Sequence, residues 1–173
     1  MTQLLDEIET CIPALRRYAR ALTGNVDQAD DLVQDCLERA IRKRHLWSPT
    51  GTLQSWLFTL LINIYRNQLR SLKDRPSLSS IDEITSEPSI PASQPDQIAL
   101  AETKRALASL PLEQREVLLL VTIEGMAYKE AAEILNIPIG TLMSRLGRAR
   151  KRLRKLVDHE PEKSEPTNLR RVK

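Results

Sequence analysis

The sequence predicts an all-α protein made of two small helical domains joined by an extended linker. Apolar residues recur at spacings of three and four along both ends of the chain, and no stretch shows strand alternation of useful length. Residues 74–97 contain four prolines and six serines and lack glycine, so they cannot hold a long helix and have little to bury. Four acidic and no basic side chains fall within residues 76–100, between two segments that are net basic. Such an acidic connector suggests two units that both touch a polyanion.

Changes in composition divide the chain into four segments. We expect a first helical domain over residues 1–73, an acidic flexible linker over 74–97 and a second helical domain over 98–157. The tail, residues 158–173, is expected to be disordered. Each domain then has only about 60–75 residues, a size that is marginal for independent stability and suits docking onto a large partner.

Three helices are expected in the first domain, over about residues 10–22, 27–45 and 52–72. Gly24 suits the left-handed position that ends the first helix. The second helix has acids in its first turns and bases in its last ones, as the helix dipole favours. The apolar stripes expected to face the core are Ile12, Leu15, Ala19 and Leu22, then Ala29, Leu32, Val33, Cys36, Leu37, Ala40 and Ile41, then Leu53, Trp56, Leu57, Leu60, Leu61 and Ile64.

Four helices are expected in the second domain, over about residues 98–108, 112–123, 128–135 and 138–156, and the last two have the pattern of a helix-turn-helix. Ala132 is small, as required where two helices approach closely. Asn136 falls at the turn, where asparagine tolerates the left-handed conformation. Pro138 lies in the first turn of the last helix, where its missing N–H costs nothing. Ile137 and Leu142 are expected to fill the angle between the helices.

The last helix is amphipathic, and its outer face is strongly basic. Seven arginines and lysines fall within residues 145–155, without an acid. An apolar stripe expected to face a core is formed by Ile139, Leu142, Leu146, Ala149, Leu153 and Leu156. Because the N-terminal part of the second helix reaches base edges in this motif, the candidate base contacts are Thr141, Met143, Ser144, Arg145 and Arg148. The later charges, from Lys151 onward, are expected to meet phosphates or solvent.

Composition excludes several other classes of protein. No run of 18 apolar residues is present, and the acidic N-terminus lacks the basic region of a secretory signal, so we expect a cytoplasmic protein. Cys11 and Cys36 form no CxxC pair and the two histidines are isolated, which argues against a metal site or a disulfide framework. Motifs of the P-loop, GxSxG and HExxH types are absent. We therefore expect no enzyme activity, no cofactor and no small-molecule substrate.

Two long motifs resemble a known family. "DDLVQDCLERA" and "SWLFTLLINIYRNQLR" resemble region 2 of bacterial sigma factors of the extracytoplasmic-function group, and residues 110–150 resemble region 4 nearly end to end. The resemblance covers about residues 10–72 and 98–156. It implies a promoter-specificity subunit of RNA polymerase that recognises −35 and −10 elements, helps to melt the latter, and is controlled by an anti-sigma factor. The implied partners are the β′ and β subunits of core RNA polymerase and promoter DNA.

Region 2 of the family supplies the expected polymerase contact. Asp31, Gln34 and Asp35 lie at i, i+3 and i+4, on one face of a helix. Sigma factors of this kind use the matching surface to bind a coiled coil of the β′ subunit. An acidic and amide-bearing patch suits basic partner helices, whereas composition alone would favour a solvated helix start.

The third expected helix carries a polar stripe opposite its core face. Its members are Asn63, Arg66, Asn67, Arg70 and Lys73. The resemblance places the −10 element along this face and along the loop that precedes it, where the family captures an unstacked base. Asn67 stands where the family frequently has aspartate. Trp47 in the loop is a candidate stacking residue, although a plain hydrophobic cap on the helix bundle is the favoured interpretation.

Other interpretations differ in the partners they require. A stand-alone DNA-binding regulator explains the helix-turn-helix but not Asp31, Gln34 and Asp35, and affinity for core polymerase distinguishes the two. A protein-interaction module, in which both halves bind a regulator, is compatible with the first interpretation. The linker has about 25 residues, which at roughly 3.3 Å each could span about 80 Å, enough to place one domain at each promoter element.

Overall fold

The computed structural model describes residues 2–47, 51–74 and 95–157, and within these ranges it consists of α-helices and one short 3-10 turn, without a strand. The all-α prediction is confirmed. The first half contains α1 (Thr2–Thr23), α2 (Val26–Arg42), the 3-10 turn η1 (Arg44–Leu46) and α3 (Leu53–Asp74). The second half contains α4 (Pro95–Ala108), α5 (Leu112–Thr122), α6 (Tyr128–Leu135) and α7 (Ile139–Val157).

The first half is a three-helix bundle around aromatic and aliphatic side chains. The α1 and α3 helices meet through Tyr18 and Phe58, whose rings are fully buried and lie edge to face with centroids 5.2 Å apart. The buried Cys36 of α2 donates a hydrogen bond of 3.4 Å to the carbonyl oxygen of Leu57 on α3. At the start of α2, the Asn25 side chain accepts a hydrogen bond from the Gln28 N–H, which satisfies one unpaired donor of the first turn.

Helix boundaries in the first half differ from the expected ones in two places. The α1 helix begins at Thr2, eight residues before the expected start, because Ile8 is buried and extends the apolar stripe upstream. The α2 helix ends at Arg42, and a 3-10 turn occupies the residues expected to be its last ones. Gly24 adopts a φ of +72°, which confirms its expected left-handed position after α1.

For three residues of the predicted apolar stripes, the expectation that they face the core is wrong. Ile41, Ile139 and Leu156 are 43%, 49% and 42% exposed. Each lies in the first or last turn of its helix, where periodicity alone overestimates burial. In α7, Leu142, Leu146 and Ala149 are buried in the core, and the half-buried Leu153 packs against it.

Part of the expected linker is helical. The α3 helix ends at Asp74, and α4 begins at Pro95. The fixed φ of proline suits the first position of a helix. Residues 75–94 of the linker, the "SPT" residues 48–50 of the loop before α3, and the tail 158–173 lie outside the described residues. No helix in the described ranges combines the length and apolarity needed to cross a bilayer.

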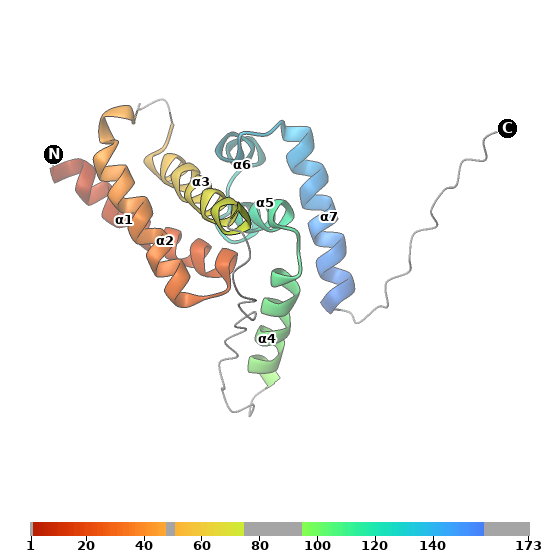
Figure 1. The fold of residues 1–173 in the computed structure, drawn as a ribbon. Coiled ribbons are helices and arrows are strands. Elements are labelled where there is room, and N and C mark those ends of the chain that lie inside the picture. Colours follow the sequence, from red (N-terminus) through yellow and green to blue (C-terminus); the bar gives the residue numbers. More distant parts are fainter. Residues whose placement is uncertain (1, 48–50, 75–94, 158–173) are drawn as a thin grey trace.

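The two halves pack against each other. Figure 1 shows α3 lying beside α5 and α6, with α4 below and α7 on the far side. Buried side chains of both halves form one continuous apolar cluster, from Ile8 in α1 to Ala149 in α7. The sequence suggested that each small domain would gain stability from an external partner. In the structure each half instead supplies part of the other's core.

Burial makes the Cys36 thiol inert in the folded chain. Burial raises the pKa of Cys36 to about 12, so at pH 8 only about one thiol in ten thousand is the reactive thiolate. In a Cys11→Ser variant we expect no labelling by a disulfide reagent at pH 8, and one equivalent after denaturation. Fast labelling of the native variant would show that α2 and α3 separate readily.

The same shift has a consequence for alkaline stability. The folded-state pKa of Cys36 exceeds its unfolded value, so its contribution to stability is present below about pH 9 and is lost as the pH rises toward 12. Burial also raises the pKa of Tyr18 well above its ordinary value. The urea midpoint is therefore expected to fall between pH 9 and 11, and to fall less in a Cys36→Ala variant.

Candidate nucleic-acid and polymerase interface

The turn between α6 and α7 has the backbone of a tight helix-turn-helix. Asn136 ends α6 in the left-handed conformation, with φ 53° and ψ 50°, as the sequence predicted. The N–H of Ile137 donates to the carbonyl oxygen of Ala132 at 3.0 Å. Pro138 starts the next turn, and its carbonyl accepts from the Leu142 N–H at 3.1 Å. These bonds fix the direction in which α7 leaves the turn.

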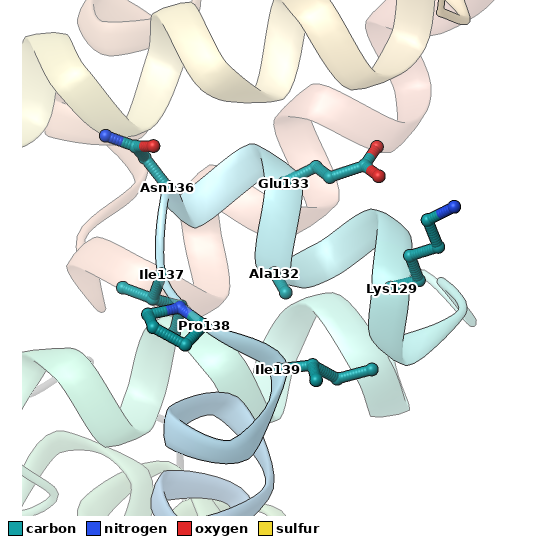
Figure 2. Close-up of a pocket in the computed structure, with 7 residues that line it drawn as sticks. All are labelled: Lys129, Ala132, Glu133, Asn136, Ile137, Pro138 and Ile139. Atoms are coloured by element: carbon teal, nitrogen blue, oxygen red, sulfur yellow. The ribbon is translucent and has the colours of Figure 1, made fainter.

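The outer side of this turn is open. Figure 2 shows Lys129, Glu133 and Asn136 projecting from α6 and its C-terminus, with Ile139 at the start of α7. They surround a shallow pocket of about 390 Å³, with Ala132 and Pro138 among its other lining residues. Ala132 is 5% exposed, which agrees with the close helix approach that its small side chain predicted.

The predicted −35 residues all lie on α7 but differ in exposure. Met143, Ser144, Arg148 and Lys151 are exposed, whereas Thr141 and Arg145 are half-buried. The Ser144 hydroxyl donates to the Thr141 carbonyl oxygen at 2.9 Å, within the helix. Arg145 forms an ion pair with Glu113 of α5 at 2.8 Å, and only 22% of its side chain is exposed. Arg148 is thus the more accessible arginine in this conformation.

The predicted polymerase-binding residues form an acidic face on α2. Asp31 and Gln34 are exposed, and Asp35 is half-buried. The Gln34 amide donates to Glu38 at 3.2 Å along the helix, and Asp35 accepts a hydrogen bond of 3.2 Å from Gln68 of α3. The Asp35 contact joins α2 to α3, which orients this face relative to the predicted −10 residues.

The predicted −10 residues of α3 fall into two environments. Asn63, Asn67 and Arg70 are exposed. Arg66 is instead bonded to Glu116 of α5 through both carboxylate oxygens, at 2.9 Å and 2.6 Å. This hydrogen bonding raises the pKa of the Arg66 guanidinium, so the guanidinium stays charged throughout the ordinary pH range.

Trp47 lies at a cavity between the two halves. The cavity has a volume of about 300 Å³ and is lined on one side by Trp47, Thr52, Ser55 and Trp56 and on the other by Glu130, Glu133 and Ile134. Trp47 packs against the apolar cluster, as a hydrophobic cap would. Its indole Nε1 is buried and has no hydrogen-bond partner among the described residues. Trp56, expected in the core, is half-buried.

Three contacts that join the halves through glutamate side chains are absent from the sequence-based predictions. Besides Arg66 and Glu116, Arg17 of α1 binds both oxygens of Glu124, at 3.0 Å and 2.5 Å. The Ser55 hydroxyl donates to Glu130 of α6 at 2.5 Å. Their partners are 50, 107 and 75 residues apart in the sequence, and no local pattern pairs residues over such separations. A separate contact joins Arg115 of α5 to the Leu22 carbonyl at 2.9 Å.

Comparison with protein families assigns both halves to parts of sigma factors. Residues 8–62 match the model described as the Sigma2 domain of PhyR, and residues 100–153 match region 4 of sigma-70. The solved structure of the sigma factor RpoE bound to the anti-sigma factor NepR, from Bartonella quintana, superposes with a TM-score of 0.73 at 33% identity. That match covers 93% of this chain and 100% of RpoE. CnrH, solved with the cytosolic domain of CnrY, has a TM-score of 0.65 at 25% identity, over 92% and 88% of the two chains.

Together, the helix-turn-helix, the region 2 bundle and these matches define a sigma factor of the sigma-70 type. A curated relative, the ECF RNA polymerase sigma factor EcfG of Rhodopseudomonas palustris, is 41% identical over 157 residues, which are 89% of this chain and 84% of the relative. The chain belongs to the extracytoplasmic-function family of RNA polymerase sigma factors. Members of this family are transcription initiation factors and not enzymes.

Proposed function

We propose that this chain binds core RNA polymerase and directs initiation at promoters with defined −35 and −10 elements. The observation that carries the proposal is that one chain combines a basic helix-turn-helix on α6–α7 with an acidic, exposed face on α2. A stand-alone DNA-binding regulator would need only the first of these surfaces. The protein would act in the cytoplasm, where polymerase and DNA are found.

Each surface has a distinct role in this proposal. The α2 face, with Asp31, Gln34 and Asp35, binds basic helices of the β′ subunit, and the protein also contacts the β subunit. The −35 element is read by α7 through Thr141, Met143, Ser144, Arg145 and Arg148, with Lys151 at the phosphate backbone. The −10 element is bound and opened by the α3 face and the preceding loop, through Trp47, Asn63, Arg66, Asn67 and Arg70. Unstacking a base costs a few kcal/mol, which a binding pocket must recover.

An anti-sigma factor is the proposed regulatory partner. Two structurally similar sigma factors, RpoE and CnrH, were solved in complex with NepR and with the cytosolic domain of CnrY. In both structures the sigma-factor chain is similar to this chain over most of its length. This supports an analogous inhibitor for this chain, of a kind that binds the helical halves and excludes polymerase.

Promoter-selective transcription tests the proposed function directly. The purified chain is mixed with sigma-free core polymerase and genomic DNA, and the 5′ ends of the transcripts are mapped. We expect initiation at a small set of sites that share two spaced elements, and none with core polymerase alone. No initiation, together with no stable complex with core polymerase, would contradict the proposal and leave a DNA-binding regulator.

Replacing Arg145 tests base recognition by α7. The Arg145→Ala variant is expected to relax specificity at one −35 position, because a bidentate arginine–guanine contact provides about 1–3 kcal/mol of discrimination. In the structure Arg145 must leave Glu113 to make that contact. Affinity is measured for duplexes that carry each base at each −35 position.

The Lys151→Ala variant is the matched control for this measurement. Removing a phosphate contact is expected to weaken binding to all DNA sequences equally. It should also reduce the slope of log affinity against log salt concentration by about one unit. If Arg145→Ala behaves in the same uniform way, Arg145 contacts the phosphate backbone and not a base.

A further inference from the structure

The cavity between α3 and α6 combines aromatic rings with negative charge. Its volume is about 300 Å³, at the lower end of the range of about 300–1,000 Å³ that is typical of small-molecule sites. Trp47 and Trp56, the two tryptophans of the chain, both line it. The carboxylates of Glu130 and Glu133 belong to its opposite wall. Aromatic surface and a few convergent polar groups are the features that small ligands require.

The negative charge of this cavity is not balanced by its walls. Among the described residues that line it, none is a lysine, an arginine or a histidine. The exposed Glu133 carboxylate has no hydrogen bond or ion pair within the part of the chain that the structure describes. Two carboxylates thus face the cavity without a cation beside them, in a chain whose formal net charge is +3.

The hydroxyl groups of the cavity wall spend their protons inside the protein. The Ser55 hydroxyl donates to one oxygen of Glu130 at 2.5 Å. The Thr52 hydroxyl lies 2.5 Å from the Ser55 hydroxyl and must therefore be the donor of that pair. The Thr59 hydroxyl donates to the Ser55 carbonyl oxygen at 3.0 Å. No hydroxyl proton is left for an anion, whereas carboxylate oxygens remain available to a cation.

We propose that this cavity is a binding site for a small organic cation with an alkylated nitrogen. Tryptophan is the best aromatic partner of a cation, and quaternary ammonium groups are typical ligands of aromatic sites. Alkyl groups on the nitrogen would contact the two indoles and the apolar side chains of Leu46 and Ile134, which also line the cavity. The inference is independent of the proposed promoter function, because Trp56 and the two glutamates have no role in it.

The first test titrates the full-length chain with choline and follows the two indole N–H signals by NMR. Choline carries a trimethylammonium group, and its neutral isostere, with a tert-butyl group in that place, has the same shape without the charge. We expect saturable shifts of both signals with a Kd of about 1 mM for so small a ligand, and binding of the isostere that is about tenfold weaker. Shifts that do not saturate, or that the isostere reproduces at the same concentrations, would overturn the proposal.

Replacing Glu133 tests the role of charge without risk to the fold. The side chain is exposed, so Glu133→Gln is expected to weaken choline binding about two- to fivefold and to leave the isostere unaffected. Glu102→Gln makes the same change of net charge at an exposed position of α4 and is expected to bind as the wild type does. An unchanged affinity in Glu133→Gln, or an equal loss in Glu102→Gln, would contradict a local charge contact.

Replacing Trp56 tests the aromatic wall. Trp56→Leu keeps an apolar side chain at this half-buried position and removes one ring. The variant is expected to lose most of the preference for choline over its isostere, because the preference depends on the ring and not on apolar area. A preference that stays at the wild-type level would overturn the aromatic part of the site. The Glu133 measurement decides the proposal if Trp56→Leu does not fold.

Two further measurements identify the source of the ligand and the state that binds it. Lipid headgroups also carry quaternary ammonium, but the cavity lies between two helices, so we expect no sedimentation with phosphatidylcholine vesicles. Sedimentation without saturable binding of free choline would overturn the proposal in favour of a membrane surface. A ligand that binds only the folded chain raises its stability. The urea midpoint should therefore rise with choline, more in the wild type than in Glu133→Gln, and an equal rise with sodium chloride would contradict specific binding.

Discussion

Replacing Asp31 and Gln34 together with alanine is expected to weaken binding to core polymerase by about 10- to 100-fold. Truncating a buried interfacial hydrogen bond that involves a charge costs about 1.5–3 kcal/mol, and each 1.4 kcal/mol is a factor of ten in affinity. Both side chains are exposed in the free chain, so their removal creates no cavity in the fold. Alanine is also the better helix former, and the helical content should not fall.

Binding to purified core polymerase is measured by competition with a labelled wild-type chain. Glu102→Ala, which removes one exposed negative charge from α4, is the control for a general electrostatic effect. An unchanged affinity of the double variant would remove the role we give to the α2 face. A similar loss in the control would mean that net charge, and not this face, governs binding.

Replacing Phe58 with alanine is expected to lower the free energy of unfolding by about 3–5 kcal/mol. Phe58 is fully buried and packs edge to face on Tyr18, and such an aromatic pair adds about 0.5–1.5 kcal/mol beyond the buried area. Tyr18 also binds the backbone of Glu116, so the cavity would loosen the contact between the halves as well as the first bundle.

Urea unfolding at pH 7 measures this effect. The urea midpoint should fall while the slope of the transition stays constant, because the wild type and the Phe58→Ala variant expose a similar surface on unfolding. Phe58→Leu largely conserves volume and is expected to cost less than about 1.5 kcal/mol. If alanine costs no more than leucine, the α1–α3 contact is not the stabilising centre of this half.

The helices and the helix-turn-helix could be predicted because their signals are local. Apolar spacing places the helices, and the turn at Asn136 depends on the conformation of one residue with a known preference. The core-facing positions of α7 follow in the same way, except at its ends, where Ile139 and Leu156 are exposed. Two motif sets in a fixed order were sufficient to identify the family.

The state of individual site residues could not be predicted, because it depends on contacts that no local pattern encodes. Arg66 and Arg145 were both expected to face DNA, and the structure pairs them with Glu116 and Glu113. Each of these glutamates reads in the sequence as an ordinary polar position of α5. Glu116 in particular lies among buried residues of a helix whose apolar positions are nearly continuous, so its burial has no periodic signal.

The cavity between the halves gives the protein its own optical reporter. The chain contains two tryptophans, and both line that cavity, facing Glu130, Glu133 and Ile134 of α6. Any separation of α3 from α6 would bring water to both indoles at once. Their emission should then move to longer wavelength, so that separation of the halves can be followed in the unlabelled wild-type chain, in real time, as a tryptophan-free DNA strand is added.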